Sequence, residues 1–222
     1  MKGELPAISG EDQAGLTRQR LSRIAKRAFD LAFALAALVL LFPIFVLAAL
    51  LIKADLTGPI LFRQERVGLG GVPFRVHKFR TMQLNAEERG VVTVQNDSRV
   101  TRIGRFLRRY KIDELPQLFD VMLGSMSVVG PRPEVREYFL LYPRDAQRAM
   151  ISMRPGITGP SVLVSLDERE CLGLSADPRE TYASEIIPIK ARYIVEYAAH
   201  NSLLGDLRII LITLRKLFSG KV

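Results

Sequence analysis

Residues that build disulfides and metal centres are scarce in this sequence. Among its 222 residues, one is cysteine (Cys171) and two are histidine (His77 and His200). A single cysteine forms neither an internal disulfide nor a metal-binding pair, so a reducing compartment is the simplest expectation. The two histidines lie far from each other and from the cysteine in the sequence, which argues against a zinc site.

The sequence also lacks a phosphate-binding loop and a cleavable signal peptide. Gly68, Gly70 and Gly71 in VGLGG are not followed by the Lys-Ser/Thr pair that such a loop requires. The amino-terminal apolar segment is too long and lies too far into the chain for a signal peptide, and no small-residue cleavage site follows it. We therefore expect this segment to remain in the mature protein.

Basic residues outnumber acidic ones throughout the chain. The 32 Lys and Arg residues exceed the 23 Asp and Glu residues and give a formal net charge of +9. Such an excess predicts a polyanionic partner, which is a nucleic acid, an anionic membrane surface or a phosphorylated substrate. Charge alone does not choose among these three classes.

Charged side chains are absent from Leu31 to Ile52, a run long enough to span about 30 Å of hydrocarbon. Pro43 lies inside this run, removes a backbone donor and is expected to kink or break the helix near Leu41 and Phe42. Basic residues flank both ends of the run, which favours both ends on the cytoplasmic face. We therefore predict a re-entrant helix-break-helix hairpin in one leaflet, with a proline-kinked transmembrane helix as the alternative.

These features divide the chain into three parts. We predict a flexible tail over residues 1–17, a re-entrant membrane hairpin over 18–55 and a cytoplasmic domain over 56–222. Asp30, at the start of the apolar run beside Lys26, is expected to form a structural ion pair. The expected fold class is α+β: a mainly helical, membrane-associated domain with a short β-hairpin and amphipathic interfacial helices.

Local patterns indicate the elements of the cytoplasmic domain. Apolar and polar residues alternate over Ile60–Arg66 and Val72–Phe79 on either side of the glycines, which predicts a β-hairpin. The segments Glu185–Ala199 and Leu203–Phe218 have helical patterns. The second is short for a membrane span, so we expect it to pack on the core or to lie along the headgroups.

A basic amphipathic helix is predicted over Arg99–Lys111. Its apolar face is formed by Val100, Ile103, Phe106, Leu107 and Tyr110, and its remaining surface by Arg99, Arg102, Arg105, Arg108, Arg109 and Lys111. The basic surface is either a solvated face over a core stripe or a site for phosphate groups, with Arg108 as a candidate ligand. Pro116 then marks the first turn of a further helix that stops at Gly124.

Two adjacent carboxylates, Asp113 and Glu114, follow the basic helix. On a helix their side chains point about 100° apart, so they are expected to have different roles if both are functional. A helix amino terminus and nearby cations are expected to hold both carboxylates ionised. Asp113 is then a candidate nucleophile toward phosphorus and Glu114 a candidate magnesium ligand. The alternative is that Asp113 caps the helix that begins near Pro116.

Three further cations are candidates for substrate binding. Arg132 lies between two prolines in GPRPE, which stiffen the backbone and fix the direction of its guanidinium. A loop salt bridge is the alternative role for this residue. Lys78 and Arg80 in HKFRTM lie at the end of the second predicted strand, where site residues are common.

Several long motifs occur together in one order. They are KRAFD, PILFRQERVG, FRVHKFRTM, TRIGRFLRRYKIDELPQL, GSMSVVGPRPE and RPGITG. In these motifs the sequence resembles the bacterial sugar transferase family, the monotopic phosphoglycosyl transferases, from about Lys26 to Phe218. The family's membrane segment is re-entrant with a proline break, which corresponds to Pro43 here.

The resemblance implies transfer of a sugar 1-phosphate from a UDP-sugar to undecaprenyl phosphate, the first membrane step of a bacterial glycan pathway. It implies that Asp113 is the covalent nucleophile, that Glu114 binds the Mg²⁺ cofactor and that Arg132 binds substrate. The expected location is the cytoplasmic face of the bacterial inner membrane, where residues 56–222 form the catalytic domain. Membrane lipid is a further expected partner, and a homodimer is possible for such a protein.

The sequence departs from the family pattern in two places. After RPGITG it reads PSVLVSLDERECLG, where many members have a Trp- or Ala-Gln-Val segment and an Asn-Gly-Arg turn. This loop is expected to shape the sugar pocket, so the sugar is not determined by the sequence. The additional amino-terminal membrane spans of the family's long forms do not occur here, which predicts a short form with the catalytic core only.

Two other functional classes compete with the enzyme. A membrane-tethered adaptor would bind nucleic acid or anionic lipid through Arg99–Lys111 and use DELPQ only as a cap. The sequence has no recognised nucleic-acid motif and little aromatic interleaving in that helix, so we expect no nucleic-acid partner. A scaffold without catalytic function is the other alternative, and the intact DE and PRP motifs argue against it.

Overall fold

The structure is a computed structural model that describes residues 10–84, 86, 97–163, 172, 175 and 177–219. The side chains of residues 10–20 and 218 are not described. Cys171 and most of the segment that departs from the family pattern after RPGITG therefore lie outside the described residues.

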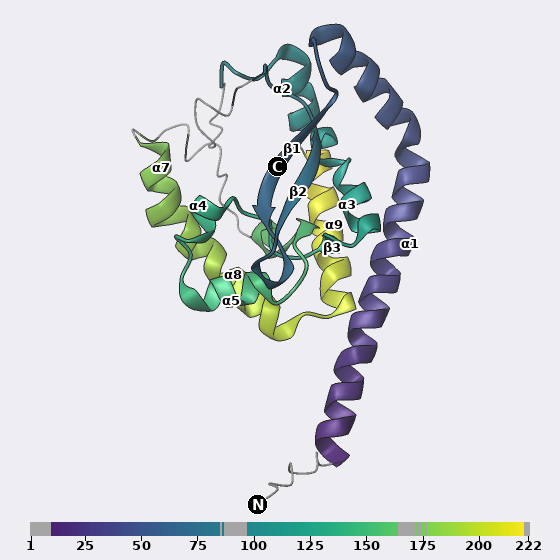
Figure 1. Cartoon of the computed structure of the whole chain (residues 1–222), viewed down its shortest axis with the longest axis vertical. Coiled ribbons are helices and arrows are strands. Elements are labelled where there is room, and N and C mark those ends of the chain that lie inside the picture. The colour runs from purple at the N-terminus through teal and green to yellow at the C-terminus, as the bar shows by residue number, and fades with distance from the viewer. Residues whose placement is uncertain are drawn as a thin grey trace, which may run out of the picture.

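A single long helix, α1 (Gly10–Asp55), forms one edge of the molecule and curves toward the other elements in its carboxyl-terminal part (Figure 1). Pro43 lies inside α1, so of the predicted kink or break near Leu41 and Phe42 the structure excludes the break. Packing explains the continuity, because α1 rests on the domain both before the proline, at Ala34, and after it, at Ala48. A lost backbone hydrogen bond is tolerated in such a helix. The predicted tail of residues 1–17 is helical from Gly10 onward.

The apolar part of α1 has two different faces. Ala34, Ala48 and Ile52 are buried against the domain, whereas Val39 and Leu40 are 70% and 78% exposed. By length and composition, residues 21–55 are able to cross a membrane, and little of their most apolar stretch is buried inside the protein. α1 is therefore a candidate for membrane association through its exposed face.

The predicted β-hairpin is confirmed. Strands β1 (Leu61–Val67) and β2 (Pro73–Phe79) pair antiparallel, with Leu61 opposite Phe79 and Val67 opposite Pro73. The connection contains a short 3-10 turn in which Gly70 and Gly71 have φ values of +68° and +77°. Residues with a Cβ adopt such values only with strain, so the glycines permit the turn.

The predicted helices around the acid pair are also present. Helix α2 (Arg102–Arg109) begins at Thr101, whose hydroxyl accepts a hydrogen bond from the backbone N–H of Gly104. A 3-10 turn, η3 (Ile112–Glu114), leads to α3 (Gln117–Leu123), which has Pro116 at its N-cap position and ends at Gly124 with φ of 92°. The predicted start and stop of this helix are confirmed.

A second, parallel sheet consists of β3 (Ser127–Val129) and β4 (Gly156–Thr158). The crossover between them contains α4 (Arg136–Phe139) and α5 (Arg144–Ile151), and a 3-10 turn, η4 (Pro160–Leu163), follows β4. The backbone of Gly156 touches that of Gly130, and a Cβ built on Gly156 would lie 2.1 Å from the Gly130 nitrogen. Only glycine allows the GPRPE segment to approach RPGITG this closely.

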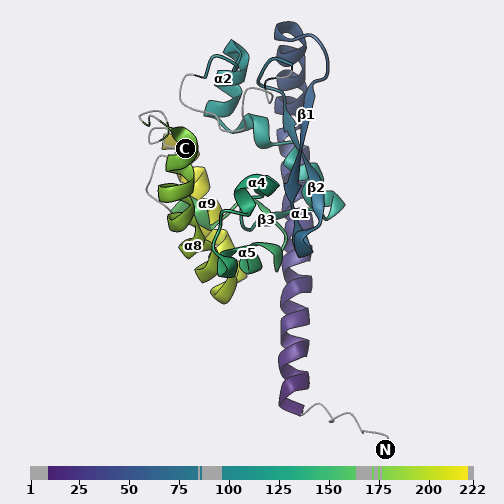
Figure 2. The same ribbon diagram turned by 60° about the vertical axis from the view of Figure 1, so that its left-hand side comes forward.

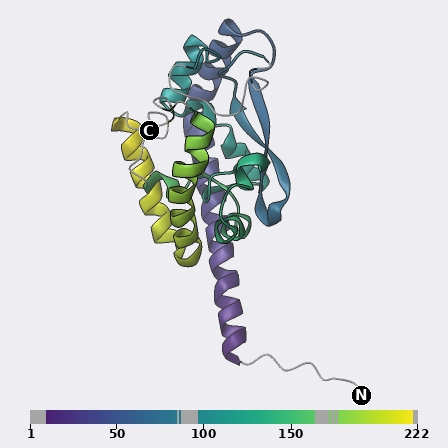
Figure 3. The ribbon, with the colours of Figure 1, turned by 90° about the vertical axis from the view of Figure 1, so that its left-hand side faces the viewer.

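The carboxyl-terminal part is helical, as predicted. It comprises α7 (Pro178–Thr181), a π-helical turn, η5 (Tyr182–Ile186), α8 (Ile187–His200) and α9 (Leu203–Ser219). The β1–β2 hairpin and the α8–α9 pair lie on opposite sides of the molecule (Figures 2 and 3).

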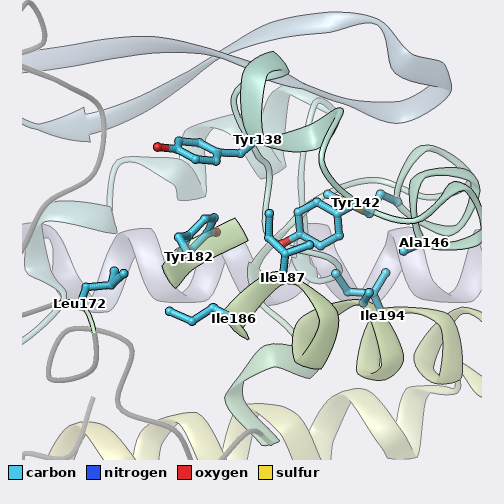
Figure 4. Close-up of a cluster of buried hydrophobic side chains, with 10 residues drawn as sticks. Tyr138, Tyr142, Ala146, Leu172, Tyr182, Ile186, Ile187 and Ile194 are labelled. Atoms are coloured by element: carbon cyan, nitrogen blue, oxygen red, sulfur yellow. The ribbon is translucent and has the colours of Figure 1, made fainter. Parts of the chain in front are cut away.

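Three clusters of buried side chains connect these elements. One lies among α4, α5, η5 and α8 and includes Tyr138, Tyr142 and Tyr182 (Figure 4). A second joins α1 to β2, α3, β3 and α9. The third joins the end of α1 to β2 and α2 through Ile52, Phe79 and Leu107. The packing of α1 is thus shared between two of the three clusters.

Charged side chains fix the start of the apolar run. Lys26 Nζ lies 2.7 Å from Asp206 Oδ2 on α9 and 3.7 Å from Asp30 Oδ1, which confirms the predicted ion pair. Asp30 Oδ1 also accepts a hydrogen bond from the backbone N–H of Val128. Arg27 donates to the carbonyls of Val121 and Met122 in the last turn of α3. The KRAFD motif thus joins α1 to α3, β3 and α9.

The contact between Gly130 and Gly156 generates a test of the fold. Gly156→Ala places a methyl group against backbone, and overpacking of this kind costs about 1–3 kcal/mol. For a chain of this size we expect the melting temperature in detergent to fall by about 2–12 °C. Gly205→Ala in α9 is the matched control, because its Cβ meets only the Ser202 hydroxyl. If Gly156→Ala had the same melting temperature as the Gly205→Ala control, this result would contradict the close approach of the Gly156 and Gly130 backbones.

Candidate active site

The acid pair lies in the turn between α2 and α3. Lys111, directly before η3, has φ of 55°, the left-handed conformation, and is the single such non-glycine residue within the described ranges. This conformation reverses the chain, and both Asp113 and Glu114 are buried, each with 7% exposure. Pro116 occupies the N-cap position of α3 without a side-chain cap bond. Asp113 is therefore not the N-cap of this helix, which rejects the capping alternative.

Two cations from different elements converge on Glu114. Lys78 Nζ on β2 donates to Glu114 Oε1 at 2.9 Å, and Arg132 Nη2 in the GPRPE loop donates to the same oxygen at 2.5 Å. Arg132 Nη1 lies 3.4 Å from Glu114 Oε2. Burial opposes ionisation of Glu114, but the charges of Arg132, Lys78 and Lys111 outweigh it and hold its pKa well below the usual range.

Asp113 is in a different environment, although it is adjacent in sequence. Its Oδ1 atom is buried and has no hydrogen-bond partner among the described residues. Burial, and then the charge of Glu114, raise the pKa of Asp113, against the effects of Lys78, Lys111 and Arg108. The pKa of Glu114 thus shifts in the direction expected for a carboxylate held ionised, whereas that of Asp113 shifts in the opposite direction because burial and the like charge dominate there.

The predicted substrate-binding residues do not all lie together. Lys78 and Arg132 meet at Glu114, and Arg108 donates from Nε to the Thr81 hydroxyl at 2.8 Å. Arg80 is buried elsewhere, where its Nη2 donates to the carbonyl of Thr57 at 2.5 Å. Arg80 follows the last residue of β2, and its side chain reaches the connection between α1 and β1.

Sequence reasoning missed a second group of charges behind the GPRPE loop. Glu134, the last residue of the motif, is buried and accepts hydrogen bonds from the hydroxyls of Tyr142 and Tyr182. Arg66 on β1 and Lys190 on α8 lie within ion-pair distance of the same carboxylate. Tyr182 and Lys190 are far from Glu134 in sequence, so no local pattern indicated these contacts.

The donor atoms of the acid pair fit a hard divalent cation. Asp113 Oδ1 is an unused carboxylate oxygen in the same turn as Glu114, and oxygen is the ligand type that Mg²⁺ prefers. The described residues contain no group of three or more His, Cys, Asp or Glu side chains that would hold a metal without further ligands. Magnesium commonly binds through one or two carboxylates together with water and substrate phosphates, and this pair suits such a site.

An apolar groove of about 540 Å³ lies between α1, the hairpin and the start of α3. Phe45 is central to it, with ring centroids 5.6 Å from Phe79 and 5.8 Å from Phe119. Pro116, which closely follows the acid pair, is part of the same lining. The groove is suited to a hydrocarbon chain and is lined by α1 residues from the apolar run.

The site thus combines a buried acid pair and two converging cations of the kind that bind phosphate groups with an apolar helix that has an exposed face. Residues 21–220 match the family described as bacterial sugar transferase, and the chain belongs to this family.

Named relatives of the chain differ in the sugar given in their names. The chain is 37% identical, over 95% of its length and 48% of the relative, to a UDP-N-acetylgalactosamine-undecaprenyl-phosphate N-acetylgalactosaminephosphotransferase of Aeromonas hydrophila. It is 35% identical, over 90% of its length and 42% of the relative, to a UDP-glucose:undecaprenyl-phosphate glucose-1-phosphate transferase of Escherichia coli (strain K12). The chain thus spans about half the length of these two relatives.

A relative of similar length is an exopolysaccharide production protein of Rhizobium leguminosarum bv. phaseoli. The two are 42% identical over 84% of this chain and 92% of the relative.

The contact between Lys78 and Glu114 leads to a prediction about stability. Lys78→Met removes a charged donor from a buried carboxylate, and a hydrogen bond of this type contributes about 1.5–3 kcal/mol. We expect the melting temperature to fall by about 3–12 °C. Arg75→Met on the exposed side of β2 is the control and is expected to change it little. Equal melting temperatures for the two variants would show that Lys78 does not stabilise Glu114.

Proposed function

We propose that this protein transfers a sugar 1-phosphate from a UDP-sugar to undecaprenyl phosphate. The observation that carries the proposal is the buried turn in which Asp113 keeps an unpartnered oxygen while Lys78 and Arg132 bind Glu114. Both substrates carry phosphate groups, which these cations suit. The names of relatives in the same family give the same two substrate classes.

The transfer proceeds in two displacements at one phosphorus atom. An oxygen of the Asp113 carboxylate attacks the phosphorus that carries the sugar, and the bond from this phosphorus to the bridging oxygen breaks. UMP leaves with the electron pair of that bond, and an aspartyl-phosphosugar remains. A phosphate oxygen of undecaprenyl phosphate then attacks the same phosphorus, the acyl-phosphate bond breaks, and the Asp113 carboxylate is returned.

The surrounding cations favour both ionisation of the nucleophile and binding of the donor diphosphate. Attack requires ionised Asp113, and the charges of Lys78, Lys111 and Arg108 act in that direction. Arg132 has a 41% exposed side chain and binds Glu114 through two nitrogens, so its guanidinium is accessible to an incoming diphosphate. Asp113 and Glu114 would hold magnesium, which when bound offsets the negative charge of the diphosphate.

The acceptor brings a long hydrocarbon chain to the site. The apolar groove around Phe45 and Phe119 supports this role because its Pro116 wall lies two residues after Glu114. Exposed apolar side chains on α1, among them Leu40 and Phe42, provide a surface for the lipid phase. We infer from these features a location at the bacterial inner membrane and a role in building a polysaccharide or another glycan.

We infer a shallow, re-entrant insertion of α1, which requires the continuous helix to bend near Pro43, because a complete crossing fits its packing less well. The charged domain packs against α1 at Ala34, Ala48 and Ile52, within the uncharged run that a spanning helix would place in hydrocarbon. At the beginning of this run Lys26 binds Asp206, and at its end Lys53 donates to the Gly58 carbonyl. Full crossing would carry polar parts of the domain into the bilayer, at high free-energy cost. We therefore place both ends of α1 on the cytoplasmic face.

The chemical proposal predicts that Asp113→Asn abolishes turnover. Purified protein in nanodiscs is incubated with a panel of UDP-sugars, undecaprenyl phosphate and Mg²⁺, and UMP release is measured. We expect one or a few donors to release UMP, with a loss of at least about three orders of magnitude in the variant because the nucleophile is removed. Without acceptor, labelled sugar is expected to remain covalently bound to wild-type protein but not to Asp113→Asn.

Asp145→Asn on the exposed surface of α5 is the control and is expected to retain full activity. Full turnover in Asp113→Asn would contradict the role of Asp113. A folded wild-type protein without UMP release from any donor in the panel would reject the proposed reaction.

The topology is tested by labelling cysteines in intact spheroplasts. The native cysteine is changed by Cys171→Ser, and a new cysteine is introduced by Ser9→Cys or Asp55→Cys on either side of the apolar run. Re-entrant insertion leaves both positions protected from an impermeant maleimide until the membrane is permeabilised. Labelling of one position in intact spheroplasts would establish a spanning helix instead.

A further inference from the structure

A buried carboxylate that the proposed reaction does not use lies behind the GPRPE loop. Glu134 Oε1 accepts hydrogen bonds from Tyr182 at 2.9 Å and Tyr142 at 3.2 Å, and the two hydroxyl groups point toward one another (Figure 4). Lys190 Nζ lies 4.0 Å from the same oxygen, and Arg66 Nη1 lies 3.8 Å from Oε2. The partners of this carboxylate therefore come from β1, the connection between α4 and α5, η5 and α8.

The π-helical turn contributes to this arrangement. Tyr182 is the first residue of η5, and its hydroxyl both donates to Glu134 and accepts from Lys190 Nζ at 3.0 Å. The Lys190 ammonium also lies 4.9 Å from the centroid of the Tyr182 ring. π-Helical turns are rare in proteins, and those that occur often lie at functional sites. Lys190 and Glu134 are too far apart for a direct hydrogen bond. The turn brings the Tyr182 hydroxyl between them, where it bonds to both.

The backbone on both sides of Arg132 is fixed by other elements. After it, Arg66 Nη1 donates to the Pro133 carbonyl at 3.1 Å, and the Val67 N–H donates to the Glu134 carbonyl at 2.9 Å. Before it, the Gly156 N–H donates to the Pro131 carbonyl at 2.9 Å. The Arg132 side chain extends away from these backbone hydrogen bonds and reaches Glu114. The backbone of Arg132 therefore has little conformational freedom as long as these hydrogen bonds are intact.

We propose that Glu134 is a positioning residue, which holds the GPRPE loop against β1 and α8 and thereby orients Arg132 toward the diphosphate of the donor. The inference rests on the proposed function and adds a role for the carboxyl-terminal helices in it. Glu134 does not touch the donor in this scheme. It acts through Pro133, the residue between Glu134 and Arg132, whose fixed φ angle transmits its position to Arg132.

The charges of the cluster explain why a carboxylate is required. The Lys190 side chain is buried and that of Arg66 is mostly buried, and a buried cation without a counter-charge is strongly unfavourable. Burial lowers the pKa of Arg66, whereas Glu134 raises it and the nearby charge of Arg132 lowers it. Arg66 is thus electrostatically coupled to both Glu134 and Arg132. Without the charge of Glu134, we expect Arg66 and Lys190 to move toward water and the loop to shift.

A double-mutant cycle tests the coupling between Glu134 and Arg132. Glu134→Gln keeps an acceptor for the two tyrosines but removes the charge. With the UDP-sugar selected by the turnover assay, we expect it to raise the donor KM about tenfold with a smaller change in kcat. In an Arg132→Ala background the same substitution is expected to change kcat/KM less than about twofold, because the residue it positions is gone.

Asp206→Asn provides the matched control. Asp206 is also a buried carboxylate that pairs with a lysine, Lys26, and a tyrosine, Tyr197, but it joins α9 to α1. We expect Asp206→Asn, like Glu134→Gln, to lower the melting temperature, but we expect Asp206→Asn to leave the donor KM unchanged. If Glu134→Gln does not fold, Tyr142→Phe, which removes one hydroxyl from the same carboxylate, takes its place in the cycle.

The outcomes separate this inference from the proposed function. Equal fold-changes for Glu134→Gln in the two backgrounds, or an unchanged donor KM, would overturn the positioning role in an otherwise active enzyme. An inactive but folded wild-type protein would overturn the proposed function before the cycle is measured. Non-additive values in an active enzyme, together with an unchanged donor KM in Asp206→Asn, would establish the coupling.

Discussion

The ionised carboxylate of Glu114 is the charge on which the active-site arrangement depends. It joins β2 to the GPRPE loop through Lys78 and Arg132, two elements that the sequence places far apart. Burying an ion pair is favourable only when the geometry is good and the remaining charges are satisfied. Two cations on one carboxylate meet this requirement, and they leave an excess of positive charge. The cluster is therefore held together by Glu114 and is at the same time receptive to a further anion.

The two carboxylates of the acid pair are separated by environment rather than by distance. The pair lies in a 3-10 turn, where adjacent residues point about 120° apart, so Glu114 contacts Lys78 and Arg132 while Asp113 Oδ1 has no hydrogen-bond partner among the described residues. The charge of Glu114 then disfavours ionisation of its neighbour, and its pKa and that of Asp113 shift in opposite directions. Opposite shifts within one pair of acids are typical of sites where the acids have different tasks.

Local signals in the sequence predicted the hairpin and the helices α2, α3, α8 and α9, but β3, β4, α4 and α5 were not predicted. The hairpin glycines, Pro116 and Gly124 each act within a few residues, and the predicted turn and helix ends are confirmed. The sequence did not decide between a kink and a break at Pro43, because the packing of α1 on both sides of it has no local signal. The same holds for Arg80, whose direction is determined by a contact with Thr57 beyond the strand end.

The candidate site was predictable in composition but not in detail. Asp113, Glu114, Lys78 and Arg132 were identified as candidates from residue type and motif, and the structure brings the last three into contact. The left-handed conformation of Lys111 was not predictable, since lysine has no preference for it. Nor were the partners of Glu134, because a buried glutamate is indistinguishable from an exposed one until the elements around it are placed.

The position of the site between polar and apolar surroundings follows from α3. This short helix carries Gln117 and Asp120 on its buried side, while Phe119 lies in the apolar groove and Leu123 is 78% exposed. Arg27 on α1 binds its last carbonyls, and the acid pair lies directly before its first turn. A displacement of α3 along α1 would therefore move the carboxylates and the groove together. The contact between α1 and α3 therefore couples the depth at which the apolar face of α1 lies in the membrane to the position of the reacting groups.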